Sequence, residues 1–268
     1  MAGLLPGCTD QSSPGPVLTV MSYNIGTRGL PIPRTDEIAE IVRRHDVPDI
    51  LLIQDAPWKV KIKDLAGSLG FAYFISGRKE PPYTNLGILS KRPLFNIDKI
   101  RFNITPTDLR PAALCAEIAM AGKTVLLCSV HLASLRFELD RMVKEGESYI
   151  PSALRLVGDE FLRDSKHTRS IEKLLKWLET KPYDAAIIGG DFNTFIFTKP
   201  IRAMNRRFDD ALWPSRDYFR GTYREVSFPI KPRIDFIFHS KDIECLKAEI
   251  IRETPGDHYP LKATFGLD

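Results

Sequence analysis

Apolar runs typical of β-strands alternate with amphipathic helical stretches in the first quarter of the chain. Residues 17–25 and 49–56 are apolar enough for buried strands. Residues 36–44 and 58–69 repeat apolar side chains at the spacing of a helix. This alternation is typical of an α/β protein.

The middle of the chain has a different pattern, in which strand-like runs follow one another with turns between them and no helix-length gaps. We expect adjacent antiparallel strands at residues 71–77, 85–91, 94–102, 114–120 and 123–132. A charged helical stretch follows at residues 137–178, and we expect Pro151 to break it.

Strand patterns return after this helical stretch. The predicted strands lie at residues 184–192, 233–240, 246–253 and 261–267. Between the first two of them, residues 198–221 are predicted to be a long irregular segment.

The pattern predicts one large domain after a short arm. Residues 1–16 are rich in Gly, Pro, Ser and Thr and are predicted to be a flexible N-terminal arm, while residues 17–268 contain no linker or repeat. We expect two mixed sheets packed face to face with outer helices, although the pattern does not give the strand order.

Composition and charge narrow the function only slightly. The chain has 43% hydrophobic residues, 27% charged residues and a formal net charge of +4, which suits a phosphate-bearing substrate without by itself indicating nucleic-acid binding. No run of 18 or more apolar residues is present, so we expect no transmembrane segment. We expect a monomer, and the sequence leaves the compartment open.

The four cysteines show neither a CxxC pair nor a dense disulfide framework, which disfavours a zinc site. Cys115 and Cys128 both lie in strand-like apolar runs. We interpret these two residues as buried free thiols.

Polar side chains recur where apolar strands leave the core. Such strand ends carry Asn24, Asp55, His131, Asp191 and Asn193. Each residue alone is more often a turn or helix cap, or an ordinary histidine, than a ligand. Carboxylate and amide oxygens are the ligands that suit Mg²⁺, with Mn²⁺ as a possible substitute, so their recurrence favours a hard divalent cation.

Three further polar residues lie near the end of the chain. Asp235 interrupts an apolar strand, where an unpaired carboxylate would be costly to bury, so we expect it to have a specific partner. Asp257 and His258 are adjacent and follow a Pro-Gly pair. A carboxylate that fixes the tautomer of His258 would create an acid/base pair beside the predicted metal.

The ordered motifs SYNI, LLIQD, LGILS, SVHL, GGDFN, RIDFIF and GDHYPL resemble those of the endonuclease/exonuclease/phosphatase superfamily, also called the DNase I-like fold. The resemblance covers residues 17–265 and implies a four-layered α/β sandwich with a metal site at one edge of the sheets. It also implies hydrolysis of a phosphoester by in-line attack of water.

The resemblance implies a role for each residue that matches a family motif. Asp55 departs from the family pattern, since a glutamate metal ligand normally stands there and aspartate is one methylene shorter. By the resemblance, Asn24, Asp55 and Asp257 contact the metal, and Asp191 and Asn193 position the water and the phosphate. His258 is implied to act in catalysis with the support of Asp235. His131 is implied to bind phosphate or protonate the leaving oxygen, and Arg110 to bind phosphate.

The substrate stays open among several classes. Five arginines between residues 206 and 224 favour a nuclease acting on DNA or RNA, although they would equally suit a solvated loop. Aromatic residues in the same segment, Trp213, Tyr218, Phe219 and Tyr223, would stack on bases, enter a lipid surface or pack beneath the loop. A sphingomyelinase-like or inositol-phosphate phosphoesterase is the alternative, and a catalytically weak phosphate-binding scaffold is the third interpretation.

Overall fold

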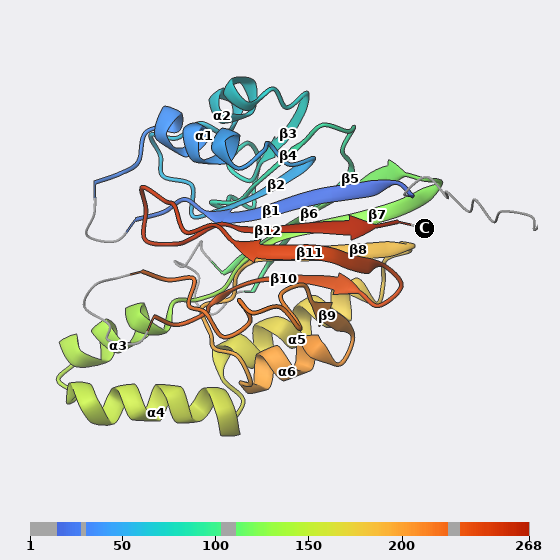
Figure 1. Ribbon diagram of the computed structural model, residues 1–268. Helices are drawn as coiled ribbons and strands as arrows, with labels where there is room; N and C mark the ends of the chain where they lie inside the picture. Colours follow the sequence, from blue (N-terminus) through green and yellow to red (C-terminus); the bar gives the residue numbers. More distant parts are fainter. Residues whose placement is uncertain (1–14, 28–30, 103–110, 225–230, 268) are drawn as a thin grey trace, which may run out of the picture.

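The computed structural model describes residues 15–27, 31–102, 111–224 and 231–267, and these form a sandwich of two six-stranded sheets (Figure 1). Sheet A contains, in spatial order, β11 (Glu244–Ile250), β12 (Leu261–Gly266), β1 (Val17–Asn24), β2 (Ile50–Gln54), β4 (Gly87–Ser90) and β3 (Tyr73–Ser76). Sheet B contains β5 (Phe95–Arg101), β6 (Ala112–Met120), β7 (Lys123–His131), β8 (Ala185–Asp191), β10 (Asp235–Ser240) and β9 (Phe208–Asp210).

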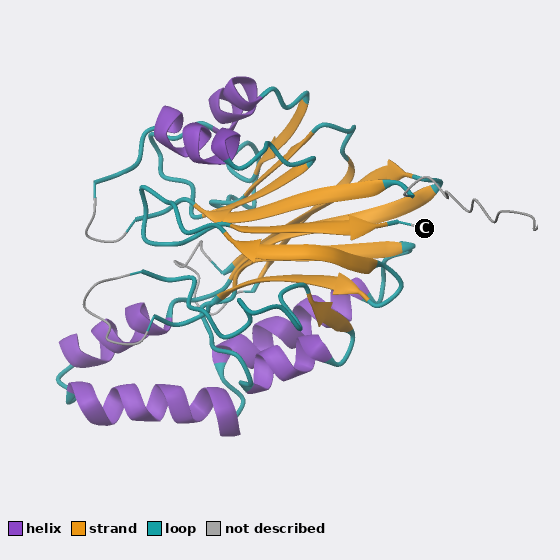
Figure 2. Cartoon of the chain, in the orientation of Figure 1, coloured by secondary structure: helices purple, strands orange, loops and turns teal. Residues whose placement is uncertain are grey.

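Helices cover the outer faces of both sheets, as Figure 2 shows. The helices over sheet A are α1 (Thr35–Arg44) and α2 (Ile62–Leu69), and those over sheet B are α5 (Lys166–Leu178) and α6 (Lys199–Asn205). A further pair, α3 (Leu135–Lys144) and α4 (Tyr149–Leu162), lies beside them. Each sheet pairs two strands in parallel, β1 with β2 and β7 with β8, so both sheets are mixed. The predicted four-layered α/β sandwich is confirmed.

The apolar periodicity of the strands explains the layers. Alternate residues of a strand face opposite sides of a sheet. In β1, Leu18 and Val20 belong to the core between the sheets, whereas Met21 and Tyr23 pack under α1 and α2. Both faces of the central strands are therefore buried, which is why their sequences are almost continuously apolar.

Three sequence expectations about helices and loops need correction. Pro151 does not break a helix, because it lies in the first turn of α4, where a missing backbone N–H is tolerated. The chain instead separates α3 from α4 near Gly146, which has a φ of +95°. Residues 198–221 are not wholly irregular, since they contain α6 and β9, and the helix expected at 58–69 is shorter, as α2.

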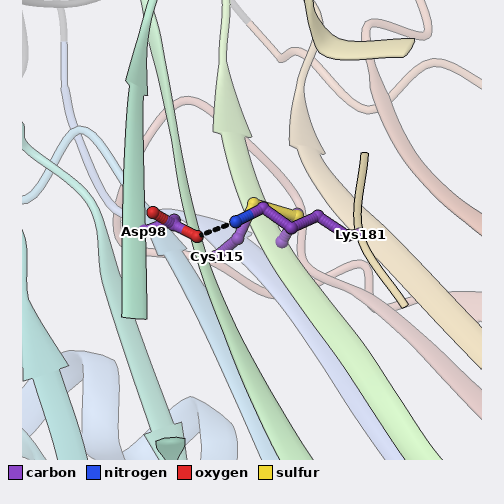
Figure 3. The surroundings of a disulfide bond; sticks show 4 residues. Asp98, Cys115 and Lys181 are labelled. Atoms are coloured by element: carbon purple, nitrogen blue, oxygen red, sulfur yellow. Dashed lines mark hydrogen bonds and ion pairs between the residues drawn. A yellow bond between two sulfur atoms is a disulfide. The ribbon is translucent and has the colours of Figure 1, made fainter. Parts of the chain in front are cut away.

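Cys115 and Cys128 are buried as expected, but they form a disulfide with an S–S distance of 2.09 Å (Figure 3). The interpretation as free thiols is therefore wrong. The reason is register, since the two residues lie directly opposite each other on the antiparallel strands β6 and β7. Lys181 and Asp98 form an ion pair of 2.6 Å beside the disulfide.

The strand directions bring the polar strand ends to one edge of the sandwich. Within sheet B, Asp191 ends β8 and pairs in register with His131 of β7 and with Asp235 of β10. The adjacent Gly190 is required for this packing, because a Cβ atom there would lie 1.9 Å from the backbone oxygen of Val130. The Gly-Gly pair before Asp191 therefore permits a close backbone approach.

No helix among the described residues is long and apolar enough to cross a membrane. Apart from its last two residues, the predicted N-terminal arm lies outside the described part of the chain, and so does Arg110.

Candidate active site

Asp191 lies at the centre of the predicted site and is almost completely buried. Its Oδ2 atom accepts hydrogen bonds from the side-chain amides of Asn24, at 2.9 Å, and Asn193, at 3.0 Å. Its Oδ1 atom accepts a third from the backbone N–H of Asn193 at 2.9 Å. These donors come from both sheets and hold the carboxylate in one orientation.

His258 and Asp235 form a second buried pair at the same edge. Nδ1 of His258 lies 2.9 Å and 3.1 Å from the two carboxylate oxygens of Asp235. The ring therefore directs Nε2 toward the interior of the site, where it lies 3.8 Å from Asp191 and 3.9 Å from Asp257. The expectation that Asp235 has a specific partner is met by this contact.

The electrostatics of this pair follow from burial and from the surrounding carboxylates. Burial by itself lowers the pKa of His258, but the charges of Asp235 and Asp191 and the hydrogen bond to Asp235 outweigh it and raise that pKa to about 10. Burial also raises the pKa of Asp191, since a buried carboxylate loses its hydration. A raised pKa of His258 favours a protonated ring beside these carboxylates at neutral pH.

His131 and Asn193 complete the arrangement around Asp191. Nε2 of His131 lies 3.6 Å from Asp191, and Nδ1 of His131 is buried without a hydrogen-bond partner among the described residues. Asn193 has a φ of +51° and donates a hydrogen bond to the backbone oxygen of Leu132 at 3.0 Å. This bond links the loop after β8 to the loop after β7.

Gly26 lies beside two of the three predicted metal contacts, Asn24 and Asp55, and close to the residue before the third. The backbone N–H of Gly26 donates to Oδ1 of Asn24 at 2.9 Å, and a Cβ atom at Gly26 would lie 2.5 Å from Oδ2 of Asp55. A Cβ atom at Gly256, the residue before Asp257, would lie 3.0 Å from the backbone oxygen of Gly26. The site thus places the amide of Asn24 and the carboxylate of Asp55 beside one small residue, and such oxygen donors suit a hard cation.

Asp55 itself has an unusual backbone. Its φ is +46°, a left-handed conformation that is uncommon for non-glycine residues, although Asp adopts it more readily than most of them. Its Oδ1 atom accepts a hydrogen bond of 3.1 Å from Asn85. Asn85 is a site residue that the sequence pattern did not indicate.

Asp191, Asp235 and His258 also bring possible ligand atoms within 4.8 Å of one another. Their mutual contacts favour a different use for them, since Asp235 is already paired with Nδ1 of His258. Mg²⁺ moreover prefers oxygen to imidazole ligands. Asn24, Asp55 and Asp257 offer oxygen ligands, which is the ligand type that this ion prefers.

A buried polar network beneath the loops was not anticipated from the sequence. Glu160 of α4 contacts Nδ1 of His167 at 2.8 Å and accepts a hydrogen bond from Thr194 at 2.6 Å. Nε2 of His167 lies 2.6 Å from the backbone oxygen of Ala133. The network therefore supports both the 131–134 loop and the 191–194 loop, and no local motif marks it in the sequence.

The match to a family profile now identifies the class of this site. The profile described as Endonuclease/Exonuclease/phosphatase family matches residues 21–258. The chain belongs to this family, as its motifs predicted, and it is therefore a hydrolase of the phosphodiesterase type whose members generally depend on a divalent metal. Among curated proteins, none matches the chain by sequence.

Solved structures share the fold at low sequence identity. TDP2 from D. rerio, complexed with a single-strand DNA product, is 17% identical with a TM-score of 0.66, covering 94% of this chain and 99% of that one. Truncated TDP2 from Caenorhabditis elegans is 20% identical with a TM-score of 0.64, covering 94% of this chain and 98% of that one. The mannosyl-6-phosphatase Bt3783 of Bacteroides thetaiotaomicron is 17% identical with a TM-score of 0.67, covering 93% and 100%.

Proposed function

We propose that this hydrolase cleaves phosphodiester bonds of DNA or RNA by in-line attack of water, with the help of Mg²⁺ or Mn²⁺. The observation that carries the proposal is the convergence of buried acid, amide and imidazole groups on one edge of the sandwich. These groups are Asn24, His131, Asp191, Asn193, Asp235 and His258.

Asn24, Asp55 and Asp257 would hold the divalent cation, because all three offer oxygen ligands and those of Asn24 and Asp55 lie beside Gly26. When bound, the cation would supply positive charge that stabilises the phosphoryl oxygens. The shorter Asp55 is compatible with Mg²⁺, which commonly retains some water ligands.

Asp191 and Asn193 position the attacking water and the phosphate in this proposal. Asp191 is the proton acceptor, because its carboxylate is fixed by three hydrogen bonds yet has a raised pKa. The side-chain amide of Asn193 is oriented by Leu132 and Asp191. A preorganised amide of this kind stabilises charge without reorganising during the reaction.

The two histidines act on the phosphoryl group and on the leaving oxygen. Asp235 engages Nδ1 of His258, so Nε2 of His258 is the atom that would donate to a phosphoryl oxygen. His131 would bind phosphate or protonate the leaving oxygen through Nε2, the ring atom that lies near Asp191. Arg110, outside the described residues, is proposed as a further phosphate contact.

Exposed aromatic rings on the segments that follow β8 and β9 support a nucleic-acid substrate. Trp213 and Phe219 are 62% and 68% exposed, and both pack edge-on against the buried ring of Tyr218 at 4.9 Å. Phe197, four residues after Asn193, is 52% exposed and lies 6.3 Å from Phe219. Such rings provide stacking surfaces for bases. The neighbour complexed with single-strand DNA is consistent with the same choice.

The arginines of residues 206–224 support the nucleic-acid choice less than their number suggests. Arg207 pairs with Glu179 at 2.6 Å, and Arg220 pairs with Asp217 at 3.0 Å. Arg224 donates a hydrogen bond to the backbone oxygen of Thr254 at 2.9 Å. Much of this positive charge is therefore committed within the protein.

A phosphomonoester is the second candidate substrate, because one neighbour of the same fold is a mannosyl-6-phosphatase. We would therefore incubate the chain with bis-p-nitrophenyl phosphate, single- and double-stranded DNA, RNA, sphingomyelin, an inositol polyphosphate and mannose 6-phosphate, each with Mg²⁺, Mn²⁺ or EDTA. Metal-dependent cleavage of DNA or RNA supports the proposal. Hydrolysis of another of these compounds instead would reassign the substrate. A folded protein that hydrolyses none of them would favour a binding scaffold.

A further inference from the structure

Helix α4 has its polar and apolar faces reversed relative to an ordinary surface helix. Its buried residues are Ser152 and Glu160, whereas Ile150, Leu154 and Leu162 are 70%, 69% and 82% exposed. A surface helix normally turns its apolar stripe toward the core. The two buried residues of α4 are polar because Glu160 serves the network with His167 and Thr194, and most of the apolar side chains of the helix face outward.

Figure 1 shows α4 as an outermost element of the molecule, on the side of sheet B. Two exposed apolar residues of the neighbouring α3, Phe137 and Val143, are 54% and 38% exposed. Exposed apolar side chains gathered on two neighbouring helices are typical of an interaction site.

The spacing of the stripe fits a partner helix. Ile150, Leu154 and Val157 are exposed, and the partly buried Phe161 continues their row, with steps of four, three and four residues, as in the seam of paired helices. The small residues Ala153 and Gly158 flank this row. A Cβ atom at Gly158 would touch nothing within 4 Å, so a partner helix would find open space there.

The stripe is also symmetric about the midpoint between Arg155 and Leu156. If two copies of α4 pack antiparallel across a two-fold axis at this midpoint, Leu154 faces Val157 of the partner subunit and Ile150 faces Phe161 of the partner subunit. The next positions match equally well, with Tyr149 opposite Leu162 of the partner subunit and Ala153 opposite Gly158 of the partner subunit. Self-complementarity of this kind is what a two-fold interface requires.

Charge favours a second copy of the chain over an anionic membrane. Residues 134–166 carry six basic and seven acidic side chains. Several are already paired, including Arg141 with Glu138 and Glu145, and Arg155 with Glu147. Helices that bind membrane surfaces usually present an excess of Lys and Arg, which this region lacks.

We infer that α4 is a homodimer interface, in which the second copy docks antiparallel. The 14 residues of α4 make a helix about 21 Å long, so the contact lies at the small end of specific interfaces. We expect a reversible dimer with a dissociation constant on the order of micromolar. This inference differs from the monomer expected from the sequence.

The test is the mass of the full chain in solution, measured by sedimentation or light scattering from about 1 µM to about 100 µM. We expect a concentration-dependent dimer for the natural chain and a monomer for Leu154→Glu, whose side chain is exposed in a single copy. The double variant Leu154→Glu with Val157→Lys should restore the dimer. An antiparallel pair places the introduced carboxylate opposite the introduced ammonium, whereas a parallel pair opposes like charges.

Leu246→Glu is the matched control, because Leu246 is 50% exposed on β11 in the other sheet. It should leave the dimer unchanged, and circular dichroism should show all variants folded. The inference would be overturned if the natural chain is a monomer, or if Leu154→Glu forms the dimer as readily as the natural chain. If Leu154→Glu abolishes the dimer and the double variant does not restore it, the antiparallel arrangement is overturned. If the natural chain stays monomeric but binds neutral phosphatidylcholine vesicles through Leu154, the stripe is assigned to a lipid surface.

Discussion

The side-chain amide of Asn24 donates a hydrogen bond of 2.9 Å to Oδ2 of Asp191. Asn24 ends β1 in sheet A, and Asp191 ends β8 in sheet B. The bond therefore crosses from one sheet to the other at the buried edge where the polar strand ends meet. The geometry of the site consequently depends on how the two sheets pack, and not on one loop alone.

Asp191→Asn should lower kcat by about 10²-fold or more, because it removes the proposed proton acceptor while preserving the size of the side chain. Hydrolysis of bis-p-nitrophenyl phosphate with Mg²⁺ would measure the loss, and thermal unfolding would show whether the fold survives. Asp209→Asn, at an exposed position of β9, is the matched control and should retain full turnover. Near-normal activity of Asp191→Asn would remove Asp191 from the mechanism.

Gly26→Ala should weaken metal activation. The new Cβ atom would lie 2.5 Å from Oδ2 of Asp55, so the carboxylate must move. We expect the Mg²⁺ concentration for half-maximal activity to rise by roughly tenfold, equivalent to about 1.4 kcal/mol of binding free energy. Gly67→Ala is the control, because a Cβ atom there meets nothing within 4 Å. An unchanged Mg²⁺ requirement in Gly26→Ala would exclude Asp55 from the metal site.

Glu160 should make the stability of the protein depend on pH. Burial acts to raise its pKa, but the hydrogen bond and charge of His167 and the hydrogen bond of Thr194 outweigh burial and lower it. A folded-state pKa below the unfolded value of about 4.3 stabilises the protein above that pH, and the stabilisation disappears as the pH falls through the folded value. The free energy of unfolding should therefore decrease on acidification.

Glu160→Gln should lose this part of the pH dependence and destabilise the protein at pH 7 by about 1–3 kcal/mol, because a buried ionic hydrogen bond is weakened. Urea unfolding of both proteins across the acid range provides the measurement. Glu244→Gln, at an exposed position of β11, is the control and should change neither the free energy of unfolding at pH 7 nor its dependence on acid pH. Identical acid profiles for the natural protein and Glu160→Gln would contradict the assigned pKa shift.

Much of the fold could be predicted because the strands are short, strongly apolar and bounded by turns. The strand ends at Asn24, His131 and Asp191 could be predicted as well, because a polar residue after an apolar run marks where the chain leaves the core. The strand order was not readable, because side-chain periodicity reports burial but not which strands pair.

Long-range contacts account for most of what the sequence did not reveal. The network of Glu160, His167 and Thr194 joins separate segments, and no spacing rule connects them. The left-handed backbone at Asp55 likewise depends on its surroundings. The disulfide is different, because the Ala121-Gly122 turn places Cys115 and Cys128 equally far from the hairpin end, and that register could have been read from the sequence.

Removing the disulfide by Cys115→Ala with Cys128→Ala should lower the free energy of unfolding by about 3 kcal/mol, the loop-closure value for a loop of this length. Urea unfolding with and without reductant measures the effect. Reductant should destabilise the natural protein by a similar amount once the buried bond is accessible, and it should not affect the double variant. Mass spectrometry after thiol labelling of the unreduced, unfolded chain is the direct check, since labelled Cys115 and Cys128 would show that the disulfide does not form.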